Sequence, residues 1–313
     1  MTLPASSEHA PRVLTLESTA DLCAPETRDE ALTTLEGGGL VFLPHLGFTL
    51  TAGERALMSD TSRMLIGFDE RAKRDGRPTI IFDPSRGRIK RHHFALRDGR
   101  IVRARIRRDA YGTLETMMAR FSGWAEDVVA RLLPDYRSVV ARDRVTYRPN
   151  ERQIVQPLHV DSSYGHPTQG RGMLRVFSNV DPGLRPRRWQ VGEPFESFAS
   201  RWVGSLRPRS AGWSGALLER LGLVGPKAPF DQLIADLRRA GKKDKEYQRT
   251  GPREIIEFPC GSTWIAITDL VVHGGLSGQH SLDQTFYLPA SGMRDPSRSS
   301  LRILERITGR ELV

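Results

Sequence analysis

The sequence predicts a mainly β protein with flanking helices, built on a double-stranded β-helix (jelly roll) core that carries a helical insertion. Three observations support this fold class. Many short apolar runs are separated by turn residues, which is typical of sandwiches and jelly rolls. One longer segment repeats its apolar residues at helical spacing. A later stretch rich in Pro, Arg and Trp separates the strand-like runs into two groups.

The chain of 313 residues is expected to begin with a poorly patterned lead-in over 1–35, followed by a single domain over 36–313. This length is sufficient to bury a substantial core, and neither an internal repeat nor a low-complexity linker divides it. Three early strands are expected. They are 37–44, entered through a glycine turn; 79–82, a short apolar run; and 100–108, which alternates apolar and basic residues.

The longest helix is expected next. Apolar side chains recur at helical spacing from Tyr111 to Leu132, and Pro134 follows, a residue that cannot continue a helix. A helix of this kind packs on the outside of a sheet. Its methionines and aromatic residues are therefore predicted to belong to the core.

The remaining strand candidates lie on both sides of the insertion, which is expected over about 181–253. Helical periodicity near 213–221 and 230–240 predicts that this insertion contains helices and forms a lid. A C-terminal helix with Leu301, Leu304 and Ile307 on its apolar face is expected to finish the chain. The strand candidates are 145–148, 153–156, 173–180, 254–258, 263–272 and 284–288.

The chain is strongly basic, with a net charge of +10 and a pI of about 10.1. Such a surface attracts nucleic acid, anionic lipid headgroups or acidic small molecules, and charge alone does not choose among them. The two cysteines, Cys23 and Cys260, exclude a disulfide framework and a thiolate metal site. The sequence shows neither a signal-peptide pattern nor an apolar run long enough to cross a bilayer, so a reducing, cytosolic compartment is expected.

The most informative motif is His159-Val160-Asp161, read together with His273. Residues i and i+2 of a strand point to the same face, so His159 and Asp161 can bind one metal ion. His273 follows an apolar strand and precedes two glycines, and it completes a set of two histidines and one carboxylate. The helical insertion then lies between the metal-binding strands. This ligand set is typical of non-heme Fe(II) oxygenases. Zn²⁺ also accepts these ligands, but no HExxH-like element accompanies them.

An Fe(II) oxygenase that activates O2 needs an electron source, commonly 2-oxoglutarate, whose distal carboxylate calls for a fixed cation. The strand after His273 contains no Arg or Lys. Arg175 lies instead in the apolar strand after His159, where an unpaired charge is costly, and is the predicted anchor. Candidate hydrogen-bond partners for the cosubstrate are Tyr147, Asn179 and Thr285. Candidate substrate contacts around the motif are Arg148, Ser163, His166 and Arg171.

Three segments resemble one known family. They are 158–163 (LHVDSS), 170–182 (GRGMLRVFSNVDP) and 264–275 (WIAITDLVVHGG). Their sequences and spacing are similar to the Kdo hydroxylases, where Kdo is 3-deoxy-D-manno-oct-2-ulosonic acid, an acidic sugar of bacterial lipopolysaccharide. The resemblance extends from about 37 to 288 and implies that the family's metal triad falls on His159, Asp161 and His273.

The resemblance implies an Fe(II)- and 2-oxoglutarate-dependent dioxygenase that hydroxylates carbon 3 of Kdo, giving the sugar called Ko. The expected partner is a Kdo-containing lipid A precursor, and the expected location is peripheral, on the cytoplasmic face of the inner membrane. The basic run 86–93 and the arginines of 103–108 are expected to form an anion-binding face.

Two other functions remain open at this point. The same iron chemistry could act on nucleic acid or a protein side chain, although no nucleic-acid-binding module is recognisable. The chain could instead be a non-enzymatic, cupin-like module that docks on an anionic membrane without a redox metal.

Overall fold

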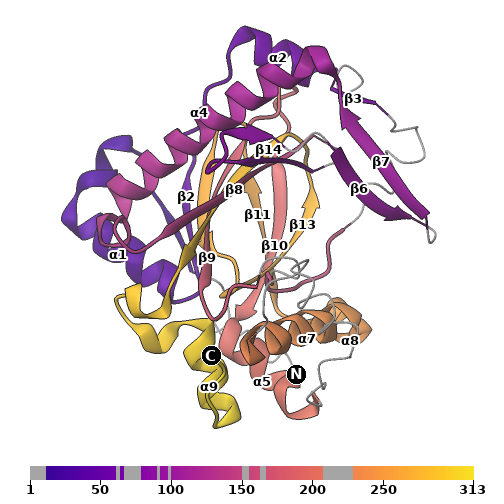
Figure 1. Ribbon diagram of the computed structural model, residues 1–313. Helices are drawn as coiled ribbons and strands as arrows, with labels where there is room; N and C mark the ends of the chain where they lie inside the picture. Colours follow the sequence, from indigo (N-terminus) through magenta and orange to yellow (C-terminus); the bar gives the residue numbers. More distant parts are fainter. Residues whose placement is uncertain are drawn as a thin grey trace, which may run out of the picture.

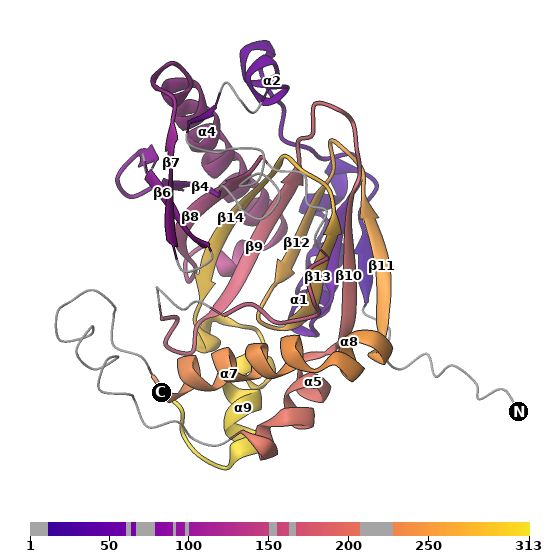
Figure 2. The same cartoon turned by 90° about the vertical axis from the view of Figure 1, so that its right-hand side faces the viewer.

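Two β-sheets stacked face to face form the centre of the computed structural model (Figures 1 and 2). The structure describes residues 12–60, 64–66, 79–89, 92–97, 100–149, 155–162, 167–206 and 228–313. The larger sheet has eight strands in the order β1-β2-β12-β9-β14-β8-β4-β5. These strands are β1 Val13–Thr15, β2 Leu40–Leu43, β4 Ile80–Asp83, β5 Arg88–Ile89, β8 Ala141–Arg148, β9 Gly172–Asn179, β12 Thr263–Ile267 and β14 Ser281–Leu288.

The smaller facing sheet has the order β11-β10-β13, formed by Arg253–Phe258, Arg187–Pro194 and Val271–Ser277. Aromatic side chains fill the space between the two sheets. Phe177 of β9 meets Trp189 of β10 edge to face at 4.9 Å, and Trp264 of β12 stacks on Phe258 of β11 at 4.0 Å between ring centroids. These contacts between large apolar surfaces hold the jelly-roll layers together, and the predicted fold class is confirmed.

The outer face of the larger sheet is covered by helices α1 (Pro25–Glu36) and α4 (Arg108–Leu132) (Figure 1). Leu114, Met118 and Phe121 of α4 are fully buried and pack in one cluster with the outer side chains of β8 and β14. The helix ends where predicted, just before Pro134. Beside it lie α2 (Ala52–Met58) and a three-stranded sheet of β3 (Leu65–Ile66), β7 (Arg100–Ile106) and β6 (His92–Arg97).

Four helices cover one end of the two sheets, with α7 lying across the strand ends in Figure 2. They are α5 (Phe195–Trp202), α7 (Pro229–Lys243), α8 (Lys245–Thr250) and α9 (Ser300–Thr308). The first three belong to the helical insertion, which joins β10 to β11. Short 3₁₀ turns are η2 Thr19–Cys23, η4 Pro134–Tyr136, η5 Val203–Ser205, η6 Ala290–Gly292 and η7 Pro296–Arg298.

Two parts of the structure differ from the sequence prediction. The single strand expected over 263–272 is two strands, because a turn at Thr268–Leu270 carries the chain from the larger sheet to the smaller one. Asp269 stabilises this turn by accepting hydrogen bonds from Met173 N (2.6 Å) and Ser300 Oγ (2.5 Å). The segment expected as an insertion over 181–253 also contains a core strand, β10. The expected helix near 213–221, and part of the strand expected at 153–156, lie outside the described residues.

We predict that Gly112→Ala and Gly123→Ala each stabilise the protein. Both glycines lie inside α4, and an added Cβ would meet no atom within 4 Å at either position. Alanine in a helix interior is favoured over glycine by roughly 0.5–1 kcal/mol. Urea unfolding should reveal this gain, whereas Gly241→Ala in α7 should destabilise, because its Cβ would lie 2.6 Å from the Phe198 ring. Equal effects at the three positions would contradict the prediction.

Candidate metal centre

Side chains from two segments, 159–161 and β13, meet at the end of the jelly roll that α7 covers. His159, Asp161 and His273 each offer a ligand atom, and these atoms lie within 4.8 Å of one another. The carboxylate of Asp161 is 3.7 Å from Nε2 of His159 and 4.0 Å from Nε2 of His273. The structure therefore brings together the three residues that the sequence predicted as a triad.

A β-bridge between the two histidines sets the geometry. The backbone N–H of His159 donates to the carbonyl of His273 at 3.0 Å, and that of His273 donates to the carbonyl of His159 at 2.8 Å. Asp161 is anchored in the same way, since its N–H donates to the carbonyl of Thr268 at 2.9 Å. The turn between β12 and β13 thus helps to position Asp161 and His273. The i and i+2 spacing of His159 and Asp161 places these two side chains on the same side of the chain.

Each histidine has its Nδ1 atom occupied by a backbone carbonyl. Nδ1 of His159 lies 2.8 Å from the carbonyl of Pro157, and Nδ1 of His273 lies 2.8 Å from that of Val271. A proton on Nδ1 leaves the lone pair of Nε2 for a metal ion. Burial lowers the pKa of both rings, and His273 lowers that of His159 further, so both are neutral as metal ligands must be.

Asp161 is the anionic member of the centre. Burial alone would raise its pKa, but the Arg175 guanidinium beside it holds the pKa of Asp161 far below its ordinary value. Nη1 of Arg175 donates to Asp161 at 2.6 Å. Two neutral imidazoles and one ionised carboxylate on one face form the donor set that suits Fe(II) and leaves positions for other ligands.

Three glutamines hold the segment that carries His159. Gln248 of α8 accepts from Leu158 N at 2.8 Å and donates to Leu158 O at 3.0 Å and to Gly241 O at 2.8 Å. Gln190 of β10 donates to Gln156 O at 2.6 Å, and Gln156 Oε1 accepts from Gly275 N at 3.1 Å. The helical insertion and both neighbouring strands therefore fix this segment.

We predict that Gly274→Ala weakens metal binding without touching a ligand. A Cβ at Gly274 would lie 2.4 Å from the carbonyl oxygen of Gln156 and 3.0 Å from that of Pro157, so the segment before His159 must move. Loss of outer supports of a metal site typically costs about 10–100-fold in affinity. Titration with Co(II) would measure it. Gly275→Ala is the matched control, because its nearest new contact is the flexible end of Gln156. Unchanged affinity in Gly274→Ala would contradict this role.

Arg175 extends from β9 toward the space between the sheets. Beside Asp161 it pairs with Asp283 of β14, which is fully buried and also pairs with Arg148 of β8. The Nε atom of Arg175 is buried and has no hydrogen-bond partner among the described residues. Thr285, its neighbour in register on β14, lies on the same face. A buried donor without an acceptor is costly, so the site has the chemistry to receive an anion.

The remaining predicted residues either have other partners or lie outside the described residues. Tyr147 faces the opposite side of the sheet from Arg175, among the residues packed against α4, and its hydroxyl is 2.7 Å from Nδ1 of His280. Asn179 donates to the carbonyls of Arg185 and Phe258. Arg171 stacks on Tyr287, with its Cζ 4.7 Å from the ring centroid. Ser163 and His166 lie outside the described residues.

Sequence reasoning did not single out Asp283, Arg238 or Lys242. Asp283 carried a weaker signal than Arg175, since it is the one charged residue of the strand β14, which also contains serine, glutamine and threonine. Arg238 and Lys242 lie on α7, and Arg238 donates to Ser162 O at 3.1 Å, next to Asp161. No signal distinguished these cations from ordinary solvated charges, because the packing of α7 is a tertiary feature.

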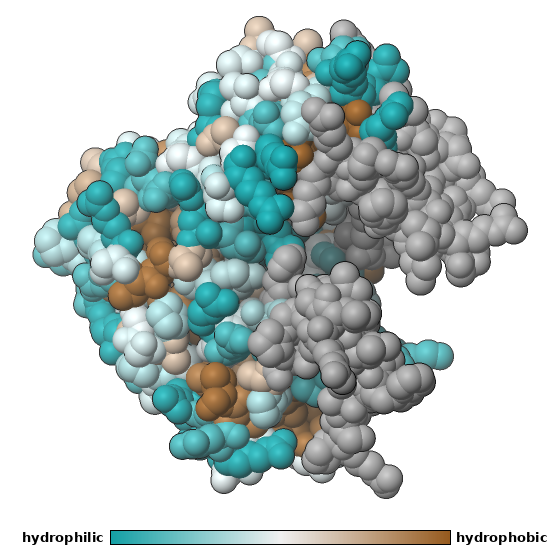
Figure 3. Space-filling model, viewed as in Figure 1, coloured by the Kyte–Doolittle hydropathy of each residue, from teal (hydrophilic) through white to brown (hydrophobic). Residues whose placement is uncertain are grey.

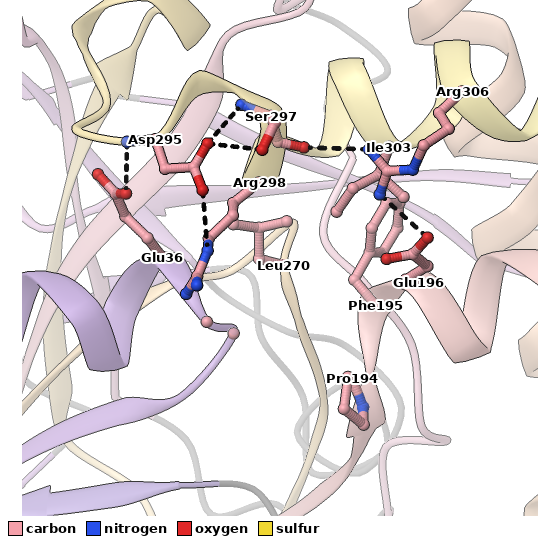
Figure 4. A pocket seen from close by; sticks show the side chains of 12 residues that line it. Glu36, Pro194, Phe195, Glu196, Leu270, Asp295, Ser297, Arg298, Ile303 and Arg306 are labelled. Carbon is pink, nitrogen blue, oxygen red and sulfur yellow. Dashed lines mark hydrogen bonds and ion pairs between the residues drawn. The ribbon is translucent and has the colours of Figure 1, made fainter.

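A pocket of about 240 Å³, which no triad residue lines, lies between the end of α1 and α9 (Figure 4). Its charged side chains already have partners. Arg298 pairs with Asp295 at 3.2 Å, Arg306 with Glu196 at 3.0 Å, and Glu36 accepts from the N–H of Asp295 at 2.9 Å. These interactions account for its charges without a ligand.

The amino-acid sequence is similar to one protein family and to curated relatives. The family model described as 3-deoxy-D-manno-oct-2-ulosonic acid (Kdo) hydroxylase matches residues 18–311. Protein YdeP of Escherichia coli, in strain K12 and in strain CFT073, is 26% identical over 196 residues, which are 59% of this chain. The chain spans only 22% of the length of these curated relatives.

Solved structures of the Kdo hydroxylase KdoO, a non-heme Fe(II) α-ketoglutarate-dependent dioxygenase, are also similar. The complex with α-ketoglutarate and Fe(III) superposes with a TM-score of 0.81 at 29% identity, covering 96% of this chain and 97% of that one. The complex with cobalt(II) gives a TM-score of 0.82 at the same identity and coverage. The similarity spans both sheets and the helices that cover them.

Proposed function

The chain belongs to the Kdo hydroxylase family, and from this premise we propose that it is an Fe(II)- and 2-oxoglutarate-dependent dioxygenase that hydroxylates carbon 3 of Kdo. The observation that carries the proposal is the convergence of two Nε2 atoms and one carboxylate at His159, Asp161 and His273. Fe(II) with O2 and 2-oxoglutarate supplies the oxidation: a C–H bond becomes C–OH, and the cosubstrate becomes succinate and CO2.

The residues of the chain would bind and orient the metal and the cosubstrate and enclose the reaction site. His159, Asp161 and His273 would hold the metal on one face. The hydrogen bonds that the histidine Nδ1–H groups donate to backbone carbonyls, and the β-bridge between the two histidines, keep the rings aimed at one point. Arg175 would receive the distal carboxylate of 2-oxoglutarate, a role supported by its position between the sheets and by its buried Nε, which has no hydrogen-bond partner among the described residues. Thr285 lies beside it. Tyr147 and Asn179 would act through packing and hydrogen bonds that support these strands.

A Kdo-containing lipid A precursor is the proposed substrate, reached at an anionic membrane surface. Arg86, Arg88, Arg105, Arg107 and Arg108 are exposed around β5, β7 and the start of α4, and they are suited to attract such a surface. In the coloured part of the face viewed, Figure 3 shows hydrophilic residues over much of the surface and hydrophobic residues in separate small patches. No helix in the described part of the chain is long and apolar enough to cross a membrane.

Mass spectrometry tests the proposal directly. Kdo-linked lipid A, incubated with protein, Fe(II), 2-oxoglutarate and O2, should gain one oxygen on the sugar and release one succinate per oxygen. Single-stranded DNA and a mixed peptide library serve as alternative substrates. Oxidation of either in place of the sugar would show that the iron chemistry is right and the substrate is wrong. Absence of cosubstrate turnover with every substrate would favour a non-enzymatic binding module.

A further inference from the structure

The helical insertion brings positive charge to the candidate metal centre. Arg238 and Lys242 are four residues apart on α7, so they share one face of the helix, and both side chains are half-buried. Nη1 of Arg238 donates to the carbonyl of Ser162 at 3.1 Å, and Ser162 directly follows Asp161. This contact beside Asp161 brings the face of α7 that carries both cations to the candidate metal centre.

These two cations reach the centre from a different element than Arg175. Arg175 belongs to β9 and donates to Asp161 from between the sheets, where it is also held by Asp283. Arg238 and Lys242 come from the helix laid across the strand ends (Figure 2). The centre therefore has positive charge on two sides, and the two sides can serve two different anions.

The neighbouring residues of α7 do not share this arrangement. Arg239 pairs with Asp236 of the same helix, and Lys243 is exposed. Arg238, in contrast, uses its described hydrogen bond on a neutral carbonyl, and no carboxylate of the described residues forms an ion pair with it. A partly buried guanidinium that forms no ion pair with another described residue is suited to bind an anionic ligand.

We propose that Arg238 and Lys242 bind the carboxylate of the sugar acid that is hydroxylated; this inference rests on the proposed function. In Kdo the carboxylate carbon is C1 and the reacting carbon is C3, so only two bonds separate the bound group from the reacting one. A cation that fixes this carboxylate must therefore lie within a few ångströms of the metal ligands. Arg238, which contacts the residue after Asp161, meets this condition, and the insertion becomes the element that selects a 2-ulosonic acid.

The test compares the acid with its C1 methyl ester in the wild type and in Arg238→Gln/Lys242→Met. A hydrogen bond to a charged group contributes about 1.5–3 kcal/mol, so each lost cation should raise the KM for the acid by about 10-fold or more. The KM for the ester should change little, and the preference for acid over ester should fall toward unity. The KM for 2-oxoglutarate and the absorption band of the iron–2-oxoglutarate complex should be unchanged. Arg239→Gln/Lys243→Met is the matched control.

The outcomes separate this inference from the function on which it rests. An unchanged preference for acid over ester in the double variant overturns it. So does an equal loss for both substrates, which would assign the cations to lipid phosphates. If the wild type does not oxidise the sugar, the proposed function fails. The subsite is then tested by anaerobic titration with free Kdo, where wild-type binding that weakens at least about 10-fold in the variant supports it and equal binding overturns it.

Discussion

Replacing Asp161 with Ala should reduce substrate-dependent succinate formation below detection. Asp161 is the only carboxylate of the proposed triad, and the variant would leave two neutral imidazoles and the positive charge of Arg175 around the metal position. Loss of mere outer supports of a metal site costs about 10–100-fold, so loss of a ligand should exceed about 100-fold. His159→Ala should have the same effect, and this substitution also removes the ring that packs beside His273.

Two measurements make this result interpretable. Co(II) titration should show weakened binding in Asp161→Ala, while urea unfolding of the metal-free protein should show that it still folds. Asp109→Ala is the control, because Asp109 is exposed at the start of α4, far from the triad in sequence, and pairs with Arg107. Normal succinate formation in both triad variants would refute the ligand assignment.

Replacing Arg175 with Met should raise the KM for 2-oxoglutarate by about 10–100-fold, since a hydrogen bond to a charged group contributes about 1.5–3 kcal/mol. Arg175→Lys should recover only part of this loss, because lysine keeps the charge but not the planar pair of donors. The Met variant should also be less stable, since it leaves the buried Asp283 with Arg148 alone.

The distal carboxylate is the group in question, so a 2-oxo acid without it provides the diagnostic comparison. The wild type should strongly prefer 2-oxoglutarate to 2-oxobutyrate, and Arg175→Met should largely lose this preference. Arg142→Met on the same sheet, where the arginine pairs with Glu126 at the surface, should keep it. A retained preference in Arg175→Met would show that another cation holds the cosubstrate.

Local patterns were sufficient for most of the fold and for the centre of the site. The i and i+2 spacing of His159 and Asp161, and the apolar strand before His273, each describe one short segment, and short segments can be interpreted without knowing the rest of the chain. The same holds for α4, whose apolar face repeats through six turns or more and ends at a proline.

Features that depend on the meeting of distant segments were missed. The turn at Thr268–Leu270 lies inside an apolar run, and it is stabilised by Asp269 bonding to Met173 and Ser300, both remote in sequence. Nothing local indicated that the run changes sheet there. Arg238 and Lys242 likewise sit on the polar face of an amphipathic helix, and only the docking of α7 against the strand ends distinguishes them from solvated charges.

The bridge between His159 and His273 has a consequence for how the protein is made. The larger sheet places β2 beside β12 and β8 beside β14, so strands from the first half of the chain pair with strands near its end. Pairings of such long range are slow to form because the intervening chain must first be closed. During synthesis the edges of the early strands therefore stay unpaired until their partner strands are made, and unpaired strand edges are sites of aggregation. The full set of proposed ligands exists only after β13, which carries His273, has been synthesised, so we expect complete metal binding to follow most of the folding.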